Sequence, residues 1–135
     1  GVGTCTQRED DPARAREPLD LMLDAVLRAG LDAGGAPGLL AGVQRIAVPK
    51  GRWRYHNPAG AIARTIGADR AATVLASVGV LQQSLIGDAC HRIATGEIHS
   101  ALVVGADAGF RIACARKAGA RAPERQQDDQ PDVSL

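Results

Sequence analysis

Aromatic residues are scarce in this sequence and make up 2% of its 135 positions. Hydrophobic residues still reach 45%, so a folded core must be built from Ala, Val, Leu and Ile. No run approaches the roughly 18 consecutive apolar residues of a membrane span, and the first residues show no basic-then-apolar signal segment. We therefore expect a cytoplasmic protein with a closely packed aliphatic core and no membrane partner.

An excess of charge of one sign is also lacking, because 16 Lys and Arg face 15 Asp and Glu. The two signs are interspersed, so nothing predicts binding to nucleic acid. The three cysteines, Cys5, Cys90 and Cys114, form no CxxC pair, which argues against a disulfide framework or a zinc site. We expect reduced thiols, no metal and no cofactor.

The length suits one domain with a modest core. Residues 1–3 resemble the exit of a strand whose beginning is missing, so we expect the sequence to be incomplete at its N-terminus. Beyond Gly119 the chain is mostly Arg, Gln, Asp and Pro, which cannot offset the entropy of ordering. The sequence predicts one folded segment over residues 1–118 and a disordered tail over residues 119–135.

Residues 43–48 predict a strand that Pro49 stops. Short apolar runs without alternation at 71–77 and 100–105 predict two further strands, both covered on their two faces. Helices are expected from Pro18 to about residue 30, from Pro58 to Gly67, over 81–95 and over 110–117, with Asn57 as a helix cap. Because helices separate the strands, the pairing should be mainly parallel. The fold class is therefore α/β, a mainly parallel sheet with covering helices.

Several residues could carry chemistry, but each also has a structural interpretation. Cys90 falls on the expected apolar side of its helix, where a thiol is hidden, and neighbouring His91 points about 100° away from it. His56 could touch a ligand or face solvent from its loop. The cluster 52–55 (Arg-Trp-Arg-Tyr) could bind a phosphate of coenzyme A, form an interface or simply close a loop. Residues 1–4 lack the third glycine of a nucleotide-binding loop.

Three stretches of the chain resemble the thiolase superfamily, in particular bacterial thiolase-like proteins related to acetyl-CoA acetyltransferase. The resemblance covers residues 1–118, about the first third of a family chain, and its motifs occur in the family's order. The matching stretches are Gly-Val-Gly-Thr at 1–4 with Arg-Glu-Pro-Leu-Asp-Leu-Met at 16–22, Tyr-His-Asn-Pro-Ala at 55–59, and residues 77–86 with 94–97 and 101–108.

The resemblance places the family's nucleophile turn near residue 79. In active thiolases that turn carries a cysteine, whose thiolate is favoured by the positive end of the following helix. Here the equivalent residue is Gly79, which has no side chain to acylate. The family's catalytic histidines and second cysteine belong to a C-terminal half that these residues do not match. No catalytic residue can therefore be assigned.

The resemblance leaves three hypotheses for function. The first is a truncated thiolase-like segment without activity of its own, which works as a homodimer or with a missing C-terminal half. The second is a fragment of an active acyl-CoA acyltransferase, completed by further residues or a partner subunit. The third is a non-catalytic assembly or binding module. An acyl-CoA would be a substrate rather than a cofactor, and the strand at 71–77 would lie near a dimer interface.

Overall fold

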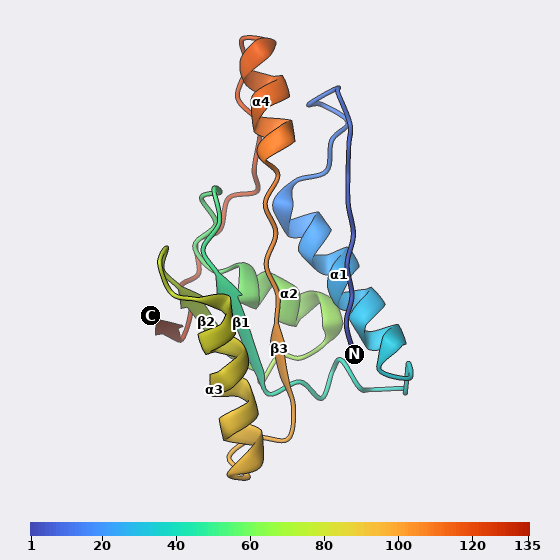
Figure 1. Ribbon diagram of the computed structural model, residues 1–135, viewed down its shortest axis with the longest axis vertical. Helices are drawn as coiled ribbons and strands as arrows, with labels where there is room; N and C mark the ends of the chain where they lie inside the picture. Colours follow the sequence, from blue (N-terminus) through green and yellow to red (C-terminus); the bar gives the residue numbers. More distant parts are fainter.

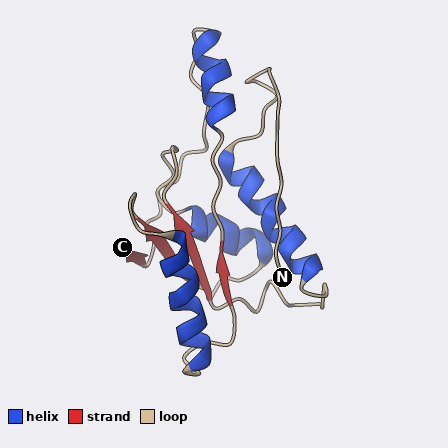
Figure 2. Cartoon of the chain, in the orientation of Figure 1, coloured by secondary structure: helices blue, strands red, loops and turns tan.

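A four-stranded, all-parallel sheet forms the centre of the computed structural model, which describes residues 1–135 (Figures 1 and 2). The strand order is β3-β1-β2-β4. The strands are β1 (Arg45–Pro49), β2 (Ala72–Ala76), β3 (Ala101–Val103) and β4 (Val133–Ser134). The expected α/β class and parallel pairing are confirmed.

Four helices accompany these strands, and the first of them precedes β1 in the chain. They are α1 (Pro18–Asp32), α2 (Pro58–Ile66), α3 (Gln82–Ala94) and α4 (Gly109–Lys117). The predicted cap of α2 is present, since the Asn57 side chain accepts a 2.8 Å hydrogen bond from the Gly60 N–H. The same helix ends at Gly67, whose positive φ of 74° suits a residue without a Cβ. No helix is long and apolar enough to cross a membrane.

The core is divided between the two faces of the sheet. On one face α1 and α2 pack on Ile46 and Val48 of β1, and the aromatic rings of Trp53 and Tyr55 complete this cluster. On the other face α3 contributes Leu85 to a smaller cluster. Successive residues of β1 thus point to opposite faces of the sheet and pack in different clusters, which is typical of a strand that is covered on both faces.

Helix α3 is rotated relative to the expectation from its apolar pattern. Its Asp88 pairs at 3.2 Å with Arg45, which lies buried on β1 beneath the helix. This pairing turns Asp88 towards the sheet and leaves Cys90 exposed, so the prediction of a buried Cys90 is wrong. Ile86 and Ile93, which lie on the same side of the helix as Cys90, are 45% and 43% exposed.

The segment after α4 differs from the disordered tail that its composition predicts. Residues 119–135 run back along the domain and end as β4, which pairs with β2 at Val74 and Leu75 (Figure 1). Polar contacts hold the segment: Asp129 with Arg64 at 3.0 Å and Asp132 with Thr73 at 2.8 Å. A composition argument counts only the apolar burial of a segment, so it misses such long-range polar contacts.

Candidate functional site

The loops that follow β1, β2 and β3 all lie at the carboxyl edge of the sheet. In open parallel α/β sheets this edge is where ligands bind, because the strands end there and the loops can diverge. Two cavities open at this edge of the molecule. Together they form the candidate site, and they differ in the residues that line them.

The first cavity lies beside the N-terminal end of α3 and has a volume of about 510 Å³. Lys50, Gln82 and Asp107 supply its charged and long polar side chains. The other lining residues are Pro49, Gly51, Ile86, Val103, Val104, Gly105 and Ala106. No Cys, Ser, Thr or His side chain lines this cavity, so it lacks the thiol, hydroxyl and imidazole groups that carry acyl transfer in thiolase-type chemistry. Its one amine, that of Lys50, donates a 3.2 Å hydrogen bond to the Tyr55 carbonyl.

Gly79 lies in the turn between β2 and α3 but does not line that cavity. Its φ is +107°, a conformation that residues with a Cβ rarely adopt, and a Cβ built there would meet no atom within 4 Å. The turn therefore leaves room for a side chain, but its backbone conformation favours glycine. A cysteine at this position would have to adopt a strained conformation.

The other candidate residues are dispersed over the molecule. Cys90 lies in the exposed part of α3, with its neighbour His91 also exposed, while His56 is exposed in the loop before α2. The Cys5 thiol donates a 3.1 Å hydrogen bond to the Leu21 carbonyl, and Cys114 is a free cysteine on α4. The structure brings none of these thiols together with an imidazole, and no three His, Cys, Asp or Glu side chains form a group suited to a metal.

The cluster at 52–55 divides into buried rings and exposed cations. Trp53 donates a 3.1 Å hydrogen bond to the Ala106 carbonyl and lies with its ring centroid 5.2 Å from that of Tyr55, so both rings belong to the core. Arg52 pairs with Asp107 at 2.8 Å and Arg54 with Glu124 at 3.6 Å. The cluster closes the loop after β1 and also presents two guanidinium groups at the surface.

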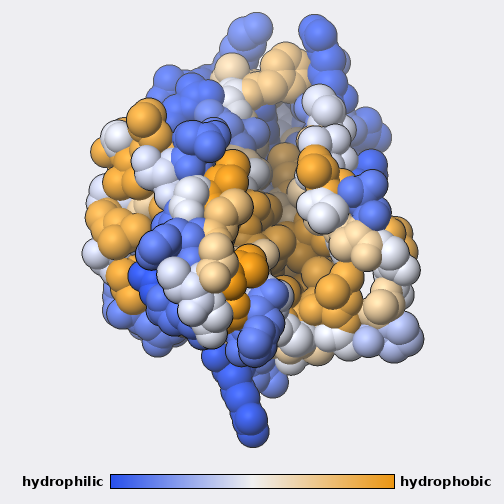
Figure 3. All heavy atoms as spheres, turned by 60° about the horizontal axis from the view of Figure 1, so that its bottom comes forward, coloured by the Kyte–Doolittle hydropathy of each residue, from blue (hydrophilic) through white to orange (hydrophobic).

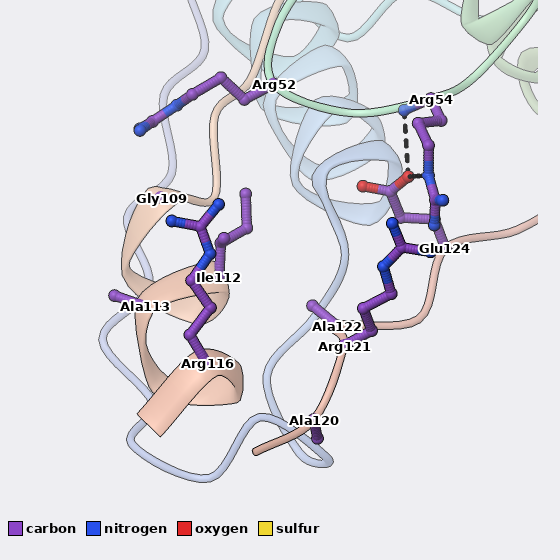
Figure 4. Close-up of a pocket in the computed structure, with 10 residues that line it drawn as sticks. All are labelled: Arg52, Arg54, Gly109, Ile112, Ala113, Arg116, Ala120, Arg121, Ala122 and Glu124. Atoms are coloured by element: carbon purple, nitrogen blue, oxygen red, sulfur yellow. Dashed lines mark hydrogen bonds and ion pairs between the residues drawn. The ribbon is translucent and has the colours of Figure 1, made fainter. Parts of the chain in front are cut away.

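Those guanidinium groups line the second cavity, whose volume is about 490 Å³ (Figure 4). One wall is α4, which contributes Arg116, and the opposite wall is the segment after α4, which contributes Arg121. The single carboxylate among the lining residues is Glu124, and it is already bound to Arg54 (Figure 4). Sequence reasoning missed Arg116 and Arg121 because they follow the folded segment's last expected strand and carry no motif.

An apolar groove lies on a different side of the molecule, between α3, β3 and the N-terminal residues. Figure 3 shows a hollow lined by hydrophobic side chains when the lower end of Figure 1 is turned forward. Its lining includes Ile86, Cys90 and Ile93 of α3 together with residues 101–104. The free edge of β3 also remains without a strand partner, since β3 is the first strand of the sheet.

Comparison of the chain with protein-family models, with curated proteins and with solved structures finds no match.

Proposed function

We propose that the chain is the N-terminal segment of a thiolase-like protein related to acetyl-CoA acetyltransferases, without acyl-transfer activity of its own. The lack of acyl-transfer activity is inferred from the residues that line the cavity beside the N-terminal end of α3. That cavity is lined by Lys50 and Asp107 but by no thiol, hydroxyl or imidazole group. An acyl thioester bound there would meet no thiol to accept its acyl group.

The thiolase-like part of the proposal is supported by the motifs of the sequence and by the elements that carry them. The Asn-Pro-Ala motif caps and begins α2 through Asn57, and the turn at Gly79 directly precedes α3 on the carboxyl side of β2. The segment would then act as a structural half that contributes α/β layers rather than chemistry. We place it in the cytoplasm, in keeping with its three free cysteines.

The apolar groove and the free edge of β3 favour a role within a larger assembly, either a homo-oligomer or a complex with a C-terminal half. Unpaired strand edges and exposed apolar side chains are the surfaces that associating chains cover. The outer edge of β2, where the resemblance implies a dimer interface, is occupied by β4 at Val74 and Leu75. A second copy could pair along that edge only after β4 leaves it.

The test is the release of CoA from acetyl-CoA and from acetoacetyl-CoA with free CoA, measured with the folded chain. We expect no rate above that of buffer, because no thiol, hydroxyl or imidazole group lines the cavity. The matched control is Cys90→Ser, which removes the exposed thiol of α3. Turnover that this substitution abolishes would contradict the proposal and favour the fragment of an active acyltransferase.

A further inference from the structure

Positive charge without a carboxylate partner is concentrated on α4 and the segment after it. Residues 108–123 contain no Asp or Glu, while Arg111, Arg116, Lys117 and Arg121 lie among them. None of these four side chains takes part in an ion pair, whereas Arg52 and Arg54 nearby each have one. The chain carries a net charge of only +1, so this excess is local.

The shape of this region turns the excess into a site. Arg116 and Arg121 lie on opposite walls of the second cavity, and both guanidinium groups lack a protein hydrogen bond (Figure 4). A concave surface with an excess of one sign of charge, here four arginines against the single carboxylate of Glu124, focuses the potential and attracts counter-ions more strongly than a convex surface. An exposed helix face with dispersed arginines would not have this property.

Neighbouring contacts hold the two walls in place. The buried Arg111 donates hydrogen bonds to the Ala15 carbonyl at 3.0 Å and to the Pro123 carbonyl at 2.8 Å. It therefore fixes α4 against the start of α1 and against the segment that carries Arg121. The backbone N–H and the guanidinium of Arg54 both contact the Glu124 carboxylate, which holds the same segment to the loop after β1. The cavity is thus bounded by tethered backbone on both sides.

We propose that this arginine-lined cavity binds a small phosphorylated organic molecule. A phosphate dianion can accept paired N–H bonds from two guanidinium forks at once, which matches cations on two walls better than a carboxylate does. The apolar lining residues, Ile112, Ala113, Ala120 and Ala122, would contact the organic part of the ligand. The inference stands independently of the proposed function, because it uses neither Gly79 nor the cavity beside α3.

The experiment is titration calorimetry on the whole chain with three probes: pyrophosphate, CoA and pantetheine, which lacks the phosphates of CoA. Pyrophosphate and CoA should bind, compete with each other and weaken as salt is raised, while pantetheine should not bind. Tighter binding of CoA than of pyrophosphate would identify an organic phosphate ester as the ligand. Binding of pantetheine as tight as that of CoA would overturn the proposal.

The variant Arg116→Ala/Arg121→Ala should weaken both phosphate probes by at least about tenfold, the value of one lost charge-assisted contact. Both residues are exposed and bonded to nothing, so circular dichroism should show an unchanged fold. Arg70→Ala is the matched control, since Arg70 is an exposed, unpaired cation before β2, at the other edge of the sheet. Equal binding by the double variant and the unaltered chain, or no saturable binding by either, would contradict the site.

Discussion

The Tyr55 hydroxyl donates a 2.8 Å hydrogen bond to a carboxylate oxygen of Glu17, which lies 38 positions earlier in the chain. Glu17 precedes the first residue of α1, and its carboxylate also accepts a 2.8 Å bond from the Arg125 backbone N–H. One buried carboxylate thus joins the loop after β1, the start of α1 and the C-terminal segment. Tyr55→Phe removes the phenol from this junction and should lower the free energy of unfolding by about 1–2 kcal/mol, measured by urea denaturation.

The same contact predicts a pH dependence on the alkaline side. Burial and the Glu17 carboxylate hold the pKa of Tyr55 well above its ordinary value of 10.0. Above about pH 10 the unfolded chain loses the phenolic proton while the folded chain keeps it, so stability is present below that pH and falls as pH rises. Urea denaturation between pH 8 and about 11 measures this slope. Tyr55→Phe should flatten it, and an unchanged slope would contradict the assignment.

The C-terminal segment should depend on Asp132. Hydrogen bonds from the Thr73 backbone N–H and hydroxyl lower the pKa of Asp132 below its usual range. Its contribution is therefore present above about pH 4 and lost as pH falls below that value. Asp132→Asn should increase hydrogen exchange at the Ser77 and Leu135 amides, which hold β4 to β2. Asp128→Asn, a change at an exposed side chain, should leave both exchange rates unchanged.

Much of the fold can be predicted from the sequence because its signals are local. The strand runs and the Asn57 cap with Pro58 each specify an element within a few residues, and the structure confirms them. The orientation of α3 could not be predicted, because it depends on the long-range pairing of its Asp88 with Arg45 of β1. Strand β4 and the arginine-lined cavity could not be predicted either, because both depend on long-range contacts and neither has a sequence motif.

We expect that position 79 requires glycine because of its backbone conformation and not because a side chain would lack room there. Gly79→Ala should lower the free energy of unfolding by about 1–2 kcal/mol, since φ is +107° and no neighbour lies within 4 Å of the new Cβ. The matched control is Gly87→Ala, in the interior of α3 and also in open space. It should raise stability by about 0.5–1 kcal/mol. Opposite signs in urea denaturation are expected, and a stabilising Gly79→Ala would contradict the positive φ of this turn.

The free edge of β3 predicts association of the chain with itself. We expect a dimer in sedimentation equilibrium at tens of micromolar, because an open parallel sheet leaves an unpaired edge. A monomer throughout that range would count against this prediction and favour a role that needs a C-terminal half.

The absence of an acyl-accepting thiol is tested most directly by intact-protein mass spectrometry after incubation with acetyl-CoA or acetoacetyl-CoA. We predict no acyl adduct on Cys5, Cys90 or Cys114. The positive comparison is Gly79→Cys, which should acylate slowly because the N-terminal end of α3 favours the thiolate, and it should not turn over because no side chain lies within 4 Å of a Cβ at that position to act as a general base. A stoichiometric acyl adduct on Cys90 of the unaltered chain, accompanied by release of CoA, would contradict this prediction and show that the segment is an enzyme.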